Sequence, residues 1–135
     1  MKFKLLVLAT CLASIAVSCG TKRTDLEVCS EGKWKYHDEQ QNLDAFLEID
    51  DDNNAKYYVP NSANLPGCTG NLLEASFQIS YLENSSEAII KGLVKNNCYN
   101  SQFSFVDNNE KVMMTCTSNK LYITRADSTI YALSK

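Results

Sequence analysis

The sequence predicts an all-β protein: a small antiparallel up-and-down barrel of about eight strands, with a β-sandwich as the alternative. Three observations predict this fold class. From Cys29 onward, apolar residues recur at every second position in short segments, the pattern of half-buried strands. Short stretches rich in Asn, Asp and Ser join these segments and favour tight turns. After residue 18, no stretch of ten or more residues shows a helical period.

The first three expected strands are 33–37, 45–49 and 55–59. In each of them an apolar face alternates with a more polar one, as a strand covered on one side requires. In the first strand, for example, Trp34 and Tyr36 share a face, and the residues between and beside them are Lys or His. The pattern therefore predicts that these two aromatic side chains point inward.

The second half of the chain continues in the same way after a long connection. Residues 60–73 hold both prolines and are expected to form an irregular loop. Further strands are expected at 75–81, 88–94, 103–105, 112–116, 121–123 and 129–134. Because consecutive strands are mostly joined by tight turns, neighbours along the chain should pair in an up-and-down order.

The turn between the second and third strands has two interpretations. Asp50, Asp52 and Asn54 match the first half of a calcium-binding EF-hand loop. However, Ala55 stands where that loop needs glycine, and Asn61 stands where it needs a bidentate glutamate. We therefore expect an ordinary hairpin turn and no metal site.

The first 18 residues have the layout of a secretory signal peptide. Lys2 and Lys4 form a short basic start, and Leu5–Val17 is an apolar run that is short for a membrane span. Removal of 1–18 lowers the number of basic residues from 13 to 11 against 16 acidic ones, so the mature formal charge is −5. This charge and the lack of a basic patch argue against a nucleic-acid partner.

The cysteines bear on the compartment. Cys11 leaves with the signal peptide, and if Cys19 carries a lipid, an even number remains. The disulfide candidates are then Cys29, Cys68, Cys98 and Cys116. Four cysteines allow three pairings, and the sequence does not choose among them.

Residues Ala16-Val17-Ser18-Cys19-Gly20 resemble the lipobox of bacterial lipoproteins, although leucine is more usual at the position of Ala16. The resemblance implies lipid attachment at Cys19. Polar residues without periodicity then predict a tether over 19–28, and the period-two pattern from Cys29 onward predicts a β-barrel domain over 29–135. The lipobox resemblance also implies export to the bacterial cell envelope and a membrane partner, with the anchor in the outer membrane or a periplasm-facing leaflet. Ordinary cleavage after Ser18 and secretion is the alternative.

Residues Gly32-Lys33-Trp34 resemble the Gly-x-Trp signature of lipocalins and lipocalin-like bacterial proteins. In that family the tryptophan closes one end of an eight-stranded barrel whose mouth can hold an apolar ligand. The resemblance therefore implies that Trp34 lies at a barrel end and that a small hydrophobic ligand is a candidate partner.

Catalytic chemistry finds little support in the sequence. His37 is the only histidine and shares a strand face with two lysines, so no catalytic residue is expected. No cofactor motif is present either. The aromatic residues on apolar faces either fill the core or line a ligand cavity, and period two suits both. The ligand-cavity candidates are Trp34, Tyr36, Tyr57, Phe77, Tyr81, Phe103 and Phe105.

Two functions remain open at this point. The first is a lipid-anchored envelope protein with a lipocalin-like domain that binds a small hydrophobic ligand. The alternative is a protein-interaction or inhibitor module with a solid core, which contacts a protein partner through surface loops such as 60–73.

Overall fold

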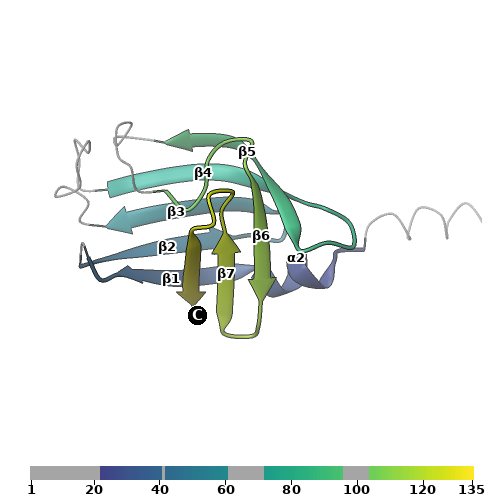
Figure 1. Cartoon of the computed structure of the whole chain (residues 1–135), viewed down its shortest axis with the longest axis horizontal. Coiled ribbons are helices and arrows are strands. Elements are labelled where there is room, and N and C mark those ends of the chain that lie inside the picture. Colours follow the sequence, from purple (N-terminus) through teal and green to yellow (C-terminus); the bar gives the residue numbers. More distant parts are fainter. Residues whose placement is uncertain (1–21, 41, 61–71, 96–103) are drawn as a thin grey trace, which may run out of the picture.

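The computed structural model describes residues 22–40, 42–60, 72–95 and 104–135. They form a short helix and eight strands: α2 (Asp25–Ser30), β1 (Gly32–Asp38), β2 (Leu43–Ile49), β3 (Asn54–Pro60), β4 (Leu72–Tyr81), β5 (Glu87–Lys95), β6 (Lys111–Cys116), β7 (Lys120–Thr124) and β8 (Ile130–Ser134). Each strand pairs antiparallel with the next, and β1 also pairs with β8 (Figure 1). The predicted up-and-down barrel is confirmed, and the closed strand order replaces the β-sandwich alternative.

The barrel forms because apolar residues alternate along every strand and meet on one side of the sheet. In β2 and β3, the buried positions are the odd-numbered ones, and they pair across the two strands, as Leu47 does with Tyr57. The largest fully buried side chains are Trp34, Tyr57, Phe105, Leu47, Leu73, Ile90, Met114, Leu121, Leu133, Val59, Val106 and Val112. Inward alanines between them accommodate the large rings in a narrow barrel.

The turns follow the predicted Asn and Asp chemistry. Asn42, Asn53, Asn84 and Asn109 adopt left-handed backbone angles, with φ between 50° and 64°. Asparagine tolerates this region better than most residues. Gly32 opens β1 with φ of 126°, a conformation that an L side chain rarely adopts, so glycine is required at the start of the Gly-x-Trp segment.

An irregularity in β5 changes which side chains face inward. Ser76 pairs with Val94 but Gln78 pairs with Lys91, so β5 holds an extra residue, and Gly92 there has φ of 65°. As a result, Val94 is 65% exposed, although simple alternation would place it beside the buried Ile90.

The expected strand at 103–105 is wrong where the structure describes it. Phe103 lies outside the described residues, and Ser104–Val106 is buried but is not a strand. The Ser104 hydroxyl bonds to the Val106 carbonyl, which is a local turn rather than a ladder. An alternating apolar pattern arises here because the segment packs into the barrel, not because it pairs with a neighbour.

Helix α2 occupies residues that the sequence suggested were mostly tether. Thr24 caps it, because the Glu27 backbone N–H donates to Thr24 Oγ1 at 3.2 Å and the Thr24 hydroxyl donates to the Glu27 carboxylate at 3.3 Å. At its other end, the Ser30 carbonyl accepts a 2.8 Å hydrogen bond from Trp34 Nε1. The Ser30 hydroxyl also lies 2.6 Å from the hydroxyl of Tyr81. The helix therefore covers the barrel end at which β1 begins and β4 finishes.

Candidate functional site

The barrel interior is the first candidate site, because most predicted cavity residues meet there. Phe105 lies among three tyrosines, with its ring centroid 5.5 Å from Tyr36, 5.5 Å from Tyr57 and 5.0 Å from Tyr131. All three ring pairs are edge-to-face, the geometry that aromatic quadrupoles favour. Tyr57 also contacts Phe77, with centroids 6.2 Å apart.

The exposure of these side chains shows how the interior is packed. Trp34, Tyr57 and Phe105 are each 0% exposed, and Phe77 is 6% exposed. A water-sized space inside the barrel would leave the side chains that line it partly accessible, so no such space borders the first three. Tyr36 and Tyr81 lie half-buried at the edge of this core. Phe103, the remaining cavity candidate, lies outside the described residues.

A polar network fixes the segment that carries Phe105. Burial alone would lower the pKa of Arg125, but hydrogen bonds and charge from Glu110 and Asp107 raise it above its ordinary value. Arg125 Nε lies 3.1 Å from Glu110 Oε1, and Arg125 Nη2 lies 2.5 Å from Asp107 Oδ2. Arg125 Nη1 and the Tyr131 hydroxyl both donate to the Ser104 carbonyl, at 3.4 and 3.1 Å. The turn before β8 therefore holds Ser104–Glu110 against the barrel.

The same segment supplies the hydrogen-bonding partner of a buried phenol. The Tyr57 hydroxyl lies 3.0 Å from Ser104 Oγ inside the core. Burial raises the pKa of Tyr57 to about 12, although the Ser104 hydrogen bond acts in the opposite direction. Tyr57 is therefore a neutral structural hydrogen-bonding group at physiological pH.

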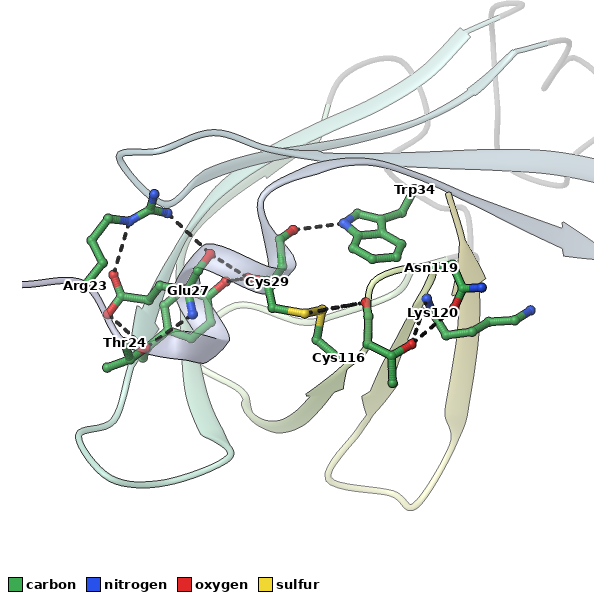
Figure 2. Close-up of a disulfide and its surroundings, with 11 residues drawn as sticks. Arg23, Thr24, Glu27, Cys29, Trp34, Cys116, Asn119 and Lys120 are labelled. Carbon is green, nitrogen blue, oxygen red and sulfur yellow. Dashed lines mark hydrogen bonds and ion pairs between the residues drawn. A yellow bond between two sulfur atoms is a disulfide. The ribbon is translucent and has the colours of Figure 1, made fainter.

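A disulfide fixes the opposite end of the barrel. Cys29 in α2 is bonded to Cys116 at the end of β6, with their Cα atoms 6.1 Å apart (Figure 2). The bond joins residues 87 positions apart. The indole N–H of Trp34, in β1, donates a hydrogen bond to the same helix. Cys68 and Cys98, the other two disulfide candidates, lie outside the described residues, as does Cys19.

The outer face of β1, β2 and β3 carries an aromatic pair among charges. The rings of Phe46 and Tyr58 stack across the strands, with centroids 5.2 Å apart and planes at 21°. Lys33 Nζ lies 5.1 Å from the Phe46 centroid and 5.7 Å from that of Tyr58. Glu48 pairs with both Lys33 and Lys56, at 3.9 Å each. We call Lys33, Phe46, Glu48, Lys56 and Tyr58 the β1–β3 face.

A shallow groove of about 520 Å³ borders the β1–β3 face. Its lining includes Lys33, Glu48, Lys56 and Ser76. The half-buried aromatic rings are of the kind in which protein interfaces are enriched, and the ammonium, carboxylate and hydroxyl groups around them match the polar rim of such an interface.

Two other predicted features have local structural roles. His37 Nδ1 lies 2.8 Å from Asp44 Oδ1 across the β1–β2 pair, on the exposed side. The carboxylate of Asp50 accepts hydrogen bonds from its own turn, including the backbone N–H groups of Asp52 and Asn54 at 2.9 Å each. These bonds are those of an Asx-type hairpin turn, as expected.

The described residues contain no group of three or more His, Cys, Asp or Glu side chains placed to hold a metal ion. No helix in this part of the chain is long and apolar enough to cross a membrane.

Comparison of the chain with protein-family models, curated proteins and solved structures found no match in any of the three.

Neither the Arg125 network nor the capped helix α2 was predicted from the sequence. Arg125 lies in a turn between strands, and its partners Glu110 and Asp107 are 15 and 18 residues away, so no local pattern marks it. For α2 a signal existed: Thr24-Asp25-Leu26-Glu27 is a capping box.

Proposed function

We propose that this chain is an exported, lipid-anchored envelope protein whose barrel is a solid scaffold that binds a protein partner through its outer surface. The observation that carries this proposal is the position of Phe105. Its ring takes up the space between Tyr36, Tyr57 and Tyr131, where a lipocalin-like barrel would hold its ligand. A barrel that is filled in this way acts through what it presents outside.

The anchor is supported by the lipobox-like residues before Cys19 and by the cysteine count. The Cys29–Cys116 bond uses two of the four candidates and leaves Cys68 and Cys98 as an even remainder if Cys19 carries a lipid. Disulfides persist mainly in oxidising compartments, which favours export.

The partner surface that best fits this proposal is the β1–β3 face. It combines stacked aromatic rings with paired charges of both signs and borders a groove. Because the rings rest on a closed sheet, a partner would bind them with little loss of conformational freedom. The loop 60–73, proposed from its composition, lies almost wholly outside the described residues.

The anchor is tested with two cysteine variants of the full chain. Cys19→Ala should abolish labelling by radioactive palmitate and release the protein from the membrane fraction. Cys11→Ala is the matched control, because Cys11 lies inside the signal peptide, and this variant should be labelled like the wild type. Undiminished labelling of Cys19→Ala would refute the anchor.

A small hydrophobic ligand remains a second candidate function. The observation in its favour is the strand number, because an eight-stranded barrel is wide enough to hold one small ligand. A stoichiometric apolar molecule in an organic extract of the gently purified protein would favour it over the solid scaffold.

A further inference from the structure

The outer surface of the last three strands differs in character from the rest of the barrel. We call the outward side chains of β6, β7 and β8 the β6–β8 face. Its basic and apolar character comes from Lys111, Met113, Lys120, Tyr122 and Ile130, and Thr124 lies between two of the apolar side chains. The remaining outward positions of these strands are threonine, alanine and serine. None of the outward positions of the three strands is acidic, in a protein with more acidic than basic residues.

Apolar side chains lie together on this face. Register places Met113 opposite Thr124, and Thr124 opposite Ile130, so these three side chains form one row across the strands. Met113 is 50% exposed and Ile130 is 62% exposed, while Tyr122, one position along the outward side of β7, is 39% exposed. Among the described residues, these are three of the five large apolar side chains that are exposed.

The basic residues of the face stand beside this apolar row. Lys111 is two positions from Met113, and Lys120 is two positions from Tyr122. Glu87 on the neighbouring strand pairs with Lys111 at 3.3 Å, and Lys120 Nζ lies 2.7 Å from Ser134 Oγ. By contrast, the β1–β3 face places Glu48 between Lys33 and Lys56. Glu87 lies at the β5 edge of the β6–β8 face, opposite Met113, and none of the outward positions within the face is acidic. Apolar groups, a tyrosine and lysines with an acidic side chain only at the edge suit the interface of a lipid bilayer.

The anchor would leave the molecule at the barrel end where β6 finishes. The disulfide holds α2 against the end of β6, the first strand of the face, and residues 22–26, where the tether joins α2, lie beside the turn between β4 and β5. The five Cα–Cα steps from Cys19 to the cap residue Thr24 span at most roughly 18 Å when the chain is fully extended. The barrel therefore cannot move far from the headgroups. Val28 on α2 is itself 57% exposed.

We infer that the β6–β8 face rests on the bilayer surface, with Met113, Tyr122 and Ile130 in the interfacial layer and the lysines toward anionic headgroups. This inference builds on the proposed lipid anchor. The anchor keeps the face close to the bilayer, where a few side chains alone would bind too weakly to hold it. In this orientation the sheet surface of β1, β2 and β3 remains available to a partner.

The test measures lysine acetylation on the lipidated chain in vesicles of about three parts phosphatidylethanolamine to one part phosphatidylglycerol. Three proteins are compared: the wild type, Met113→Glu/Ile130→Glu, and the control Gln78→Glu/Val94→Glu. The control adds the same charge at exposed positions of β4 and β5 that do not line the groove beside the β1–β3 face. Emission of Trp34, the only tryptophan and fully buried, reports that each variant is folded.

We expect Lys111 and Lys120 to react at least about threefold more slowly in the wild type and the control than in Met113→Glu/Ile130→Glu. Lys33 should react equally in all three proteins; its side chain is 59% exposed, against 57% for Lys111. Equal rates at Lys111 and Lys120 in all three would overturn the inference and leave the anchor standing. Protection that disappears when the protein is diluted in the membrane would also overturn it, since it would indicate contact between copies. Absence of palmitate on the wild type would instead refute the proposed function itself.

Discussion

At the scale of single residues, Tyr57 shows how a polar group is tolerated in the core. Its ring is fully buried between Phe77 and Phe105, and its hydroxyl is within hydrogen-bonding distance of the buried Ser104. An unsatisfied hydroxyl at this depth would cost roughly 1–3 kcal/mol, and the hydrogen bond with Ser104 helps to avoid that cost.

The raised pKa of Tyr57 predicts a change in the effect of Tyr57→Phe at alkaline pH. An unfolded tyrosine loses its proton near pH 10, whereas folded Tyr57 keeps it until about pH 12. In this window the folded state binds more protons than the unfolded state, so its stability falls as pH rises. At pH 8, Tyr57→Phe should be about 1 kcal/mol less stable than the wild type because the hydrogen bond is lost.

By pH 11.5 the wild type should have lost about 2 kcal/mol of its free energy of unfolding relative to Tyr57→Phe, because phenylalanine at this position does not ionise. Urea unfolding followed by Trp34 fluorescence measures both values. A difference between the two proteins that stays constant from pH 8 to 11.5 would show that Tyr57 is not buried as described.

The residues that point into the barrel could be predicted from the sequence, whereas the polar contacts formed when the barrel closes could not. Trp34, Leu47 and Tyr57 follow from alternation, because each strand must turn its apolar side to the barrel interior. Arg125 does not, because its place in a short turn says nothing about which carboxylates the fold will bring to it. Those contacts depend on the closure of the barrel, which is not a local property of the chain.

At the scale of elements, the segment Ser104–Glu110 is held in place by buried charges. The side chain of Glu110 is 8% exposed and that of Arg125 is 15% exposed. Glu110 also accepts backbone hydrogen bonds from Asp107 and Ala126, at 2.7 and 3.0 Å. Loss of the carboxylate charge would therefore weaken the link between this segment and the turn before β8.

We predict that Glu110→Gln lowers the free energy of unfolding by about 2–3 kcal/mol, since it leaves a largely buried guanidinium with a weaker partner. Glu87→Gln is the matched control. It breaks an ion pair to Lys111 whose members are 38% and 57% exposed, and it should change stability by less than about 0.5 kcal/mol. Chemical denaturation compares the two variants. Equal effects would mean that the Arg125 network does not hold the segment.

Removal of the Cys29–Cys116 disulfide should lower the free energy of unfolding more than Glu110→Gln does. Cys29→Ala/Cys116→Ala should lower the free energy of unfolding by up to about 4–5 kcal/mol, because the bond closes a loop of 87 residues in the unfolded chain. Val28→Ala, on the exposed side of the same helix, should change stability by less than about 0.5 kcal/mol. If the double variant unfolds at the same urea concentration as Val28→Ala, the disulfide contributes nothing to stability.

The sequence predicted elements well where pairing and alternation coincide. Seven of the eight observed strands begin within two residues of the start of a predicted strand, and β4 begins three residues earlier than expected. It failed at Ser104–Val106, because a segment packed into the barrel shows the same alternation as a strand. Helix α2 is six residues long, too short for a helical period to emerge, and only its cap marks it.

At the scale of the whole molecule, the barrel has a covered end and a filled interior. Helix α2 lies at one end of the barrel (Figure 1), where Trp34 donates a hydrogen bond to it. Phe105 and its tyrosine neighbours fill the interior. The order of the strands followed from sequential hairpins. The resemblance to lipocalins led to the expectation of a ligand mouth, but a three-residue signature carries no information about the packing at the far end.

The solid interior is tested most directly by titrating the wild type and Phe105→Ala with a fluorescent fatty acid. Truncation of a fully buried phenylalanine costs about 3–5 kcal/mol and leaves an apolar cavity, and such cavities bind apolar molecules. Stability of Phe105→Ala is checked first by the emission of Trp34. We predict no saturable binding to the wild type and saturable binding of one fatty-acid molecule to Phe105→Ala. Saturable one-site binding by the wild type, weakened in Phe105→Ala, would contradict this prediction.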